Sequence, residues 1–190
     1  MTPIMLQGPA AEPVGLAEAK AYLRIDGDDE DELVGMLVTA ARLTVEVECG
    51  RALIQQRWRL SLDRWPRGCE IRVPIAPFRA CEAVRVHAGA GTPSLVPPDA
   101  YIADAAEEGG RILMTGTPPA PARRAGGIEA DIVVGYGPRA GDVPGPLRQA
   151  VRLLVARWFE RRGDDPLDEG PARLPGDVAA LLAPYRRAGL

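Results

Sequence analysis

The chain has 190 residues, a formal net charge of −3 and 46% hydrophobic residues. This length fits one domain with an elaboration, and so large an apolar share is enough to form a core without disulfide or metal staples. The negative charge argues against a protein that holds nucleic acid by neutralising phosphates along a basic face. Only one lysine accompanies the many arginines, a bias that fits GC-rich coding as well as interface contacts.

The cysteine pattern predicts free buried thiols in a reducing compartment. There are three cysteines, an odd number, and none forms a CxxC pair. The N-terminus lacks the basic and apolar regions of a signal peptide, and we find no apolar stretch of about 18 residues. We therefore expect a protein that is neither exported by a signal peptide nor inserted in a membrane.

The first 50 residues predict two helices and have an excess of acidic residues, with ten acids against three bases. Residues 16–25 have apolar side chains near helical spacing. A second helix is expected to begin at Asp29, since Asp29 and Glu32 have capping-box spacing, and to end at Cys49, before Gly50. Its predicted buried side consists of Leu33, Leu37, Ala40, Ala41 and Val45, widened by Val34 and Val38.

Between residues 51 and 143 the apolar period changes from about 3.6 to about 2, which predicts strands. Residues 58–62 alternate as a half-buried strand should. Further strands are expected at Ile71 to Val73, from Val84 to Val86, at Arg111 to Thr115 and from Ile128 to Val134. Segments 89–98 and 115–127 are rich in Gly and Pro, so we expect loops there. The predicted result is a small antiparallel sheet.

Helical period returns after Val143. Pro144 and Pro146 suit a helix entry, because proline loses no hydrogen bond in the first turn. The helix is expected to reach Arg162, with Gly163 beyond it. The predicted core of the helical bundle comprises Leu33, Leu37, Leu147, Val151, Leu154 and Trp158.

The predicted fold class is therefore α+β, a small helical bundle with an inserted antiparallel β subdomain and a tethered C-terminal helix. Residues 1–50 supply the N-terminal bundle helices, and 51–143 form the inserted β subdomain. Residues 144–163 form the long bundle helix, and 164–190 a linker and a C-terminal docking segment.

The C-terminal segment is the most informative candidate for interaction. A short helix over 177–183 has apolar residues on one face and follows a linker that has little to bury. Such a helix either folds back on its own domain or docks on a partner, and the sequence leaves both open. Tyrosine and arginine are frequent interface anchors. The candidate docking residues are Val178, Leu181, Leu182, Tyr185, Arg186 and Arg187.

Motifs for chemistry are weak. Asp26, Asp28 and Glu30 imitate the start of an EF-hand loop, but Asp31 stands where glycine is needed and Leu37 where a bidentate glutamate is needed. A solvated helix start explains these acids better.

The remaining chemistry is equally unsupported. His87 is the single histidine, its spacing from the cysteines fits no zinc pattern, and we expect it on the polar face of a strand. There is no GxSxG motif, and no glycine-rich loop precedes the one lysine. The sequence thus predicts no catalytic, cofactor-binding or metal residues, and no enzyme.

Several segments in order resemble a known family. They are LAEAKAYLRID (16–26), GRALIQQRWRLSLDRWP (50–66), PPDAYIAD (97–104), VGYG (134–137), VPGPLRQAVRLLVARWFERRG (143–163) and LPGDVAALLAPYRR (174–187). Together they resemble the head-tail connector, or adaptor, proteins of tailed phages and of the gene transfer agents of alphaproteobacteria. The resemblance covers nearly the whole chain and is interrupted in the loops at 89–94 and 118–127.

The resemblance implies a structural protein of the particle neck, made in the bacterial cytoplasm, that forms a dodecameric ring below the portal. Its expected partners are further copies of itself, the portal protein, tail-side neck proteins and DNA that passes without specific binding. The helices would surround the channel, and the C-terminal segment would reach the portal. A negative ring suits passage of DNA, because phosphate neutralisation is what makes DNA bind.

Other functions stay open. A different ring protein of the neck or tail, such as a head-completion or tail-terminator protein, shares the same features. A stand-alone nucleic-acid or small-molecule binding protein is a further alternative, and a hydrolase is a remoter one. Salt-dependent DNA affinity would favour the binder, and turnover of a substrate the enzyme.

Overall fold

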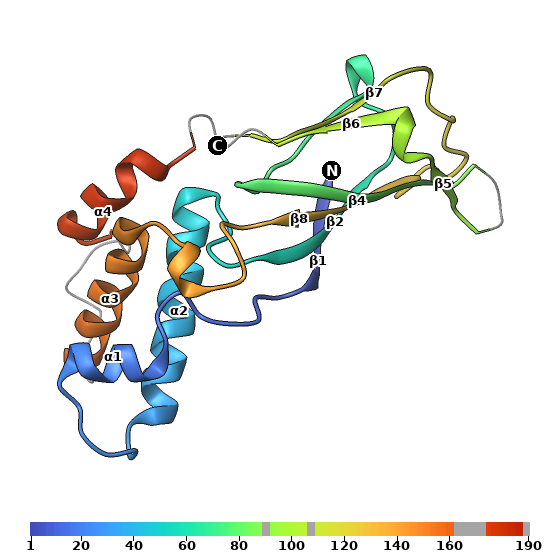
Figure 1. Cartoon of the computed structure of the whole chain (residues 1–190). Helices are drawn as coiled ribbons and strands as arrows, with labels where there is room; N and C mark the ends of the chain where they lie inside the picture. The colour runs from blue at the N-terminus through green and yellow to red at the C-terminus, as the bar shows by residue number, and fades with distance from the viewer. Residues whose placement is uncertain (89–91, 106–108, 162–173, 188–190) are drawn as a thin grey trace. The chain divides into compact units, whose positions relative to one another are not determined.

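The computed structural model describes residues 1–88, 92–105, 109–161 and 174–187, and its chain divides into two units (Figure 1). The β unit comprises Met1–Ala10 and Gln55–Tyr136, and the helical unit comprises Ala11–Ile54 and Gly137–Leu190. Helices and antiparallel sheets together confirm the predicted α+β class. The predicted linker falls largely on residues 162–173, which lie outside the described residues.

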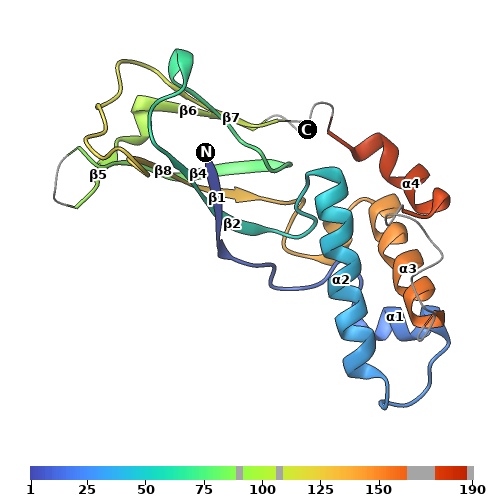
Figure 2. The same cartoon turned by 180° about the vertical axis from the view of Figure 1, so that it is seen from behind.

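The helical unit is built from α1 (Leu16–Leu23), α2 (Asp31–Cys49), α3 (Gly145–Glu160) and α4 (Gly176–Leu182). Two short 3-10 turns, Ala140–Asp142 and Ala183–Tyr185, precede α3 and follow α4. In opposite views, α1, α3 and α4 all lie to one side of α2 (Figures 1 and 2). Pro144 stands at the N-cap of α3 and Pro146 in its first turn, as the sequence predicts.

The buried side of α2 differs from the predicted one. Its fully buried apolar residues are Val34, Val38, Ala41, Val45 and Cys49. Leu33 and Leu37 are only half-buried, and Ala40 is exposed. The sequence predicts that the larger Leu33 and Leu37 lie at the centre of the buried side, whereas the structure buries the neighbouring Val34 and Val38.

The predicted start of α2 is also wrong. The helix begins at Asp31 with Glu30 as N-cap, and no side chain caps it. Asp28 and Asp31 form ion pairs with Lys20, whose Nζ lies 3.0 Å and 2.5 Å from their respective carboxylates. These ion pairs tie the acidic segment to α1. At the other end Gly50 adopts φ 63°, the left-handed conformation expected of a helix-ending glycine.

The core face of α3 contains Leu147, Ala150, Val151, Leu154 and Val155, all buried. Trp158, at the far end of the predicted stripe, is half-buried, because it lies in the last turn of the helix, near Glu160. It therefore borders the core, and the prediction of Trp158 as a core residue is wrong.

The β unit contains two antiparallel sheets, where the sequence predicts one. The larger has the order β1-β2-β8-β4-β5 and the smaller the order β3-β7-β6. Their strands are β1 (Thr2–Gln7), β2 (Gln56–Leu62), β3 (Glu70–Arg72), β4 (Phe78–Val86), β5 (Ser94–Val96), β6 (Tyr101–Asp104), β7 (Arg111–Met114) and β8 (Ile128–Val134).

Three of these strands were not expected from the sequence. β1 comes from residues predicted to have no strand, β5 from the predicted loop at 89–98, and β6 from an unassigned segment. β4 begins at Phe78, six residues before the predicted start at Val84. β5 has three residues and β6 four, too few to show a period of two reliably.

β8 is the central strand of the larger sheet, and it is buried at every position but Glu129. Its register places Ala130 opposite Leu60 of β2 and Val84 of β4. Gly110 is required where the chain enters β7, because a Cβ there would lie 2.1 Å from Cδ1 of Phe78. Gly110 thus serves the close packing of this unit.

Candidate interaction surfaces

The C-terminal segment folds back on its own unit. Val178 and Leu182 of α4 are 1% and 0% exposed, and α4 contacts α3 and α2. The sequence left fold-back and docking open, and the apolar face of α4 is occupied within the chain. Leu181 is half-buried, so it borders this contact.

Polar contacts fix the end of the segment on the end of α2. Arg51 Nε donates to the backbone carbonyl of Tyr185 at 2.7 Å, and Arg186 pairs with Glu48 at 2.9 Å. Tyr185 and Arg187 are half-buried, and Arg186 is exposed. Burial, and then the neighbouring positive charge of Arg51, lower the pKa of Arg187. The six candidate residues thus form one continuous segment, of which two members are in the core.

A charge cluster joins α1 to α3. Glu18 of α1 accepts hydrogen bonds from Arg148 at 2.9 Å to each carboxylate oxygen, and from Arg152 Nε at 2.9 Å. Arg148 also donates to the carbonyl of Pro13 at 3.0 Å. Burial pushes the pKa of Glu18 upward, but the hydrogen bonds and charges of both arginines outweigh it and hold that pKa below its usual range.

A buried arginine, Arg42, joins the start of the unit to α2. Arg42, 5% exposed, donates to Glu12 at 2.8 Å and to Glu46 at 2.8 Å. Glu46 also accepts from the backbone N–H of Leu53 at 2.8 Å. These contacts position the chain entering α1 and the chain leaving α2, so they are structural.

One face of the larger sheet has a row of ion pairs. Asp131 of β8 accepts from Arg59 of β2 at 2.7 Å and from Arg85 of β4 at 2.5 Å. Although burial raises its pKa, the hydrogen bonds from Arg59 and Arg85 outweigh that effect and lower the pKa of Asp131. Paired on both sides, Asp131 neither needs a metal ion nor is suited to act as a base.

His87 extends this cluster. Its Nε2 lies 3.2 Å from Glu129 and its Nδ1 lies 3.2 Å from Arg123. The ring is 7% exposed and follows directly after β4, so it is more enclosed than the expected strand histidine on a polar face. Both nitrogens have partners within the unit, which argues for a role in packing.

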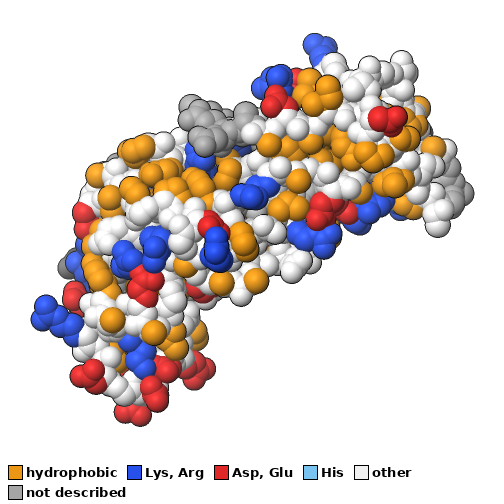
Figure 3. Space-filling view, in the orientation of Figure 1, with side chains coloured by type: hydrophobic (Ala, Val, Ile, Leu, Met, Phe, Trp, Pro, Cys, Tyr) orange, Lys and Arg blue, Asp and Glu red, His pale blue; other side chains and the backbone are white. Residues whose placement is uncertain are grey.

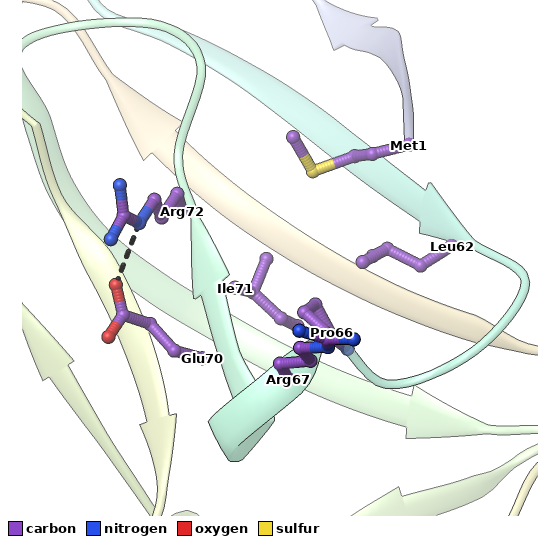
Figure 4. Close-up of a pocket in the computed structure, with 7 residues that line it drawn as sticks. All are labelled: Met1, Leu62, Pro66, Arg67, Glu70, Ile71 and Arg72. Carbon is purple, nitrogen blue, oxygen red and sulfur yellow. Dashed lines mark hydrogen bonds and ion pairs between the residues drawn. The ribbon is translucent and has the colours of Figure 1, made fainter.

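A hollow of about 400 Å³ lies in the β unit beside β3 and the N-terminus (Figure 4). Its lining side chains include Met1, Leu62 and Ile71, with the Glu70–Arg72 ion pair of 3.0 Å at one side. It contains no nucleophile or acid–base pair. We therefore assign it no chemistry.

Reactive and metal-ligating groups are not assembled elsewhere in the described ranges. No group of three or more His, Cys, Asp or Glu residues among them could hold a metal ion. Burial raises the pKa of Cys49 and of Cys81 to about 11, so both thiols are protonated at neutral pH. Of the described helices, none has the length and apolar character that a bilayer crossing requires.

Acidic side chains gather where α1 connects to α2, at one end of the helical unit (Figure 3). Asp26, Asp28 and Asp29 are exposed there. Lys20 counters the charge in part, and hydrogen bonds to Asp31 and Asp28 raise the pKa of its ammonium group. This surface repels polyanions such as DNA.

Comparisons with known proteins favour some of the functions that the sequence leaves open over others. No protein-family model matches the sequence, and no curated protein matches it. Solved structures do match. A chain in "Neck of empty GTA particle computed with C6 symmetry" has a TM-score of 0.84 and 28% identity, and the match covers 100% of this chain and 97% of that one. This chain is similar over its whole length to a neck protein of a gene transfer agent.

Two further solved structures that match this chain also come from gene transfer agent particles. A chain in "Virion of native gene transfer agent (GTA) particle" has a TM-score of 0.83 and 28% identity, covering 100% of this chain and 97% of that one. A chain in "Neck of native GTA particle computed with C12 symmetry" has a TM-score of 0.70 and 30% identity, covering 98% and 97%. The matches support a structural neck protein of a particle and give no support to an enzyme.

Sequence reasoning missed the Glu18 and Asp131 clusters. Each joins charges far apart in the chain, so no local pattern reveals them. For Glu18 one signal was present, since Arg148 and Arg152 share a face of α3 that the apolar stripe does not use.

Proposed function

We propose that this chain is the head-tail connector, or adaptor, of a gene transfer agent or phage particle. The observation that carries the proposal is the whole-length structural match to a chain of the gene transfer agent neck, with a TM-score of 0.84. Because the match extends over both units, the complete fold, and not one common subdomain, is shared.

In this proposal twelve copies form a ring below the portal, and DNA passes through it to the tail. Two of the matched necks were computed with C6 and C12 symmetry, which supports repeated copies about an axis. The net charge of −3 per chain makes such a ring strongly negative, so DNA can slide without binding. The protein would reach the particle after synthesis in the bacterial cytoplasm.

The C-terminal segment is proposed to contact the portal. Because Val178 and Leu182 are buried within the helical unit, we assign them the role of holding α4 in place. Portal contact then falls to Leu181, Tyr185, Arg186 and Arg187, which keep accessible surface. Docking through all six residues would instead require α4 to leave α3.

The function is tested by deleting the coding sequence and examining particles by negative-stain imaging and mass spectrometry. The expected result is that wild-type particles contain this chain, and that deletion yields filled heads without tails. Tailed, infective particles in the deletion strain would refute a connector role. Tails with abnormal ends and normal attachment would favour a tail-terminator protein, and heads that leak DNA a head-completion protein.

The portal contact needs a separate test that preserves folding. Leu181→Glu changes a half-buried residue at the border of the α4 contact, and Ile102→Glu introduces the same charge at an exposed position of the β unit. Loss of binding to portal-bearing heads by the first variant alone would support the contact. Equal binding by both variants would contradict it.

A further inference from the structure

α2 has a second apolar stripe, opposite its buried one. Met36, Leu43 and Val47 are 57%, 46% and 78% exposed. With half-buried Leu33 and exposed Ala40 they occur at intervals of 3, 4, 3 and 4 residues, which places them along one line of the helix. A surface helix that packs on one side only should be polar here. We name Leu33, Met36, Ala40, Leu43 and Val47 the outer stripe.

No helix of the described parts of this unit covers the outer stripe. The helices that contact α2, namely α1, α3 and α4, lie to one side of it (Figure 2). The buried apolar residues of α2 include Val34, Val38, Ala41 and Val45, none of which belongs to the outer stripe. The 3-4 spacing is that of a seam that receives another helix. The sequence of residues 162–173 has Leu167 as its single large apolar residue, so it supplies no matching stripe.

We propose that the outer stripe packs against a second copy of this chain, as the contact between neighbours in the proposed ring. This inference rests on the proposed function and adds the residues of the subunit contact. The matched necks were computed with C6 and C12 symmetry, so identical chains are repeated about an axis in them. In a ring, each copy contacts the neighbour on one side with one surface and the neighbour on the other side with a different surface.

The rotational symmetry of the matched necks indicates which kind of contact the stripe makes. Two outer stripes that faced each other would form a two-fold pair, which does not continue into a ring. The stripe instead meets a different surface of the next copy, which is the head-to-tail contact that closes a ring.

The test places a photo-crosslinking amino acid at position 47 in particles that carry the otherwise complete chain. Position 102 in the β unit is the control, since Ile102 is also an exposed β-branched residue, at 58% against 78% for Val47. The expected result is an adduct of twice the chain mass, formed from position 47 and not from position 102, whose peptides derive only from this protein. An adduct with any other particle protein, or none, overturns the proposal.

A substitution supplies the second readout. Val47→Glu should leave the melting curve of the purified chain unchanged, because the side chain is 78% exposed, yet reduce the amount of this chain in particles. Ile102→Glu should reduce neither. Wild-type incorporation by Val47→Glu overturns the outer-stripe contact alone, whereas absence of the wild-type chain from particles overturns the neck function and this inference with it.

Discussion

Replacing Glu18 by glutamine tests how the helical unit is held together. Glutamine keeps the shape of the side chain but removes the charge that accepts three hydrogen bonds of 2.9 Å from Arg148 and Arg152. A charge-assisted hydrogen bond contributes about 1.5–3 kcal/mol when buried, and much less as water screens it. Because Glu18 is one third exposed, we expect a total loss of about 2 kcal/mol.

Urea unfolding followed by far-UV circular dichroism measures this loss. Glu82→Gln is the matched control, because Glu82 pairs with Arg57 in an exposed ion pair of the β unit, for which about 0–1 kcal/mol is expected. Equal stability of the two variants would refute the argument that the α1–α3 charge cluster matters.

The effect should also depend on pH. The folded-state pKa of Glu18 is lowered, so its stabilisation is complete above its unfolded value of about 4.3 and disappears as pH falls through the folded value. The difference between wild type and Glu18→Gln should therefore be constant near neutrality and shrink in acid. A difference that persists at the lowest pH would show that the cluster does not act through the carboxylate charge.

Three further predictions concern packing and thiols. Leu154→Ala should lower the free energy of unfolding by about 2–5 kcal/mol. Trp158→Ala should lower it by less than the usual 3–5 kcal/mol for a buried aromatic, because Trp158 is half-buried, and chemical unfolding of both variants measures the two losses. Leu182→Ala should also cost about 2–5 kcal/mol, and a value near zero would show that α4 is not docked in solution. Burial raises the pKa of Cys49 and Cys81 to about 11 from an ordinary 9.0, so the thiolate fraction at pH 8 falls about 100-fold. Both should therefore react with iodoacetamide at least about 100-fold more slowly than in the urea-unfolded chain, which timed labelling and mass spectrometry can measure.

Much of the fold could be predicted because its strongest signals are local. The proline entry into α3, the glycine after α2 and the alternation in β2 and β8 each depend on neighbouring residues. β1 was missed because its six residues, Thr2–Gln7, are all exposed and show no alternation. Its partner β2 lies about fifty residues away, so nothing local marks the pairing.

The candidate site was harder to predict, for a different reason. An apolar face on α4 marks a contact but does not name the partner, and here α3 supplies it within the chain. The contacts of Arg51 with Tyr185 and of Arg186 with Glu48 join residues more than 130 positions apart. Only the folded structure could show that the predicted docking residues also secure the helical unit.

Periodicity also explains why the predicted buried side of α2 is centred on Leu33 and Leu37, whereas the structure buries the next residues, Val34 and Val38. Apolar residues occupy both the inner line, from Val34 to Cys49, and the outer stripe, from Leu33 to Val47, so periodicity alone fits either side. The helical unit has one core, and α2 buries one of these lines in it. The second line therefore calls for an apolar surface from outside the helical unit, and a repeated subunit in a ring can supply one at every position.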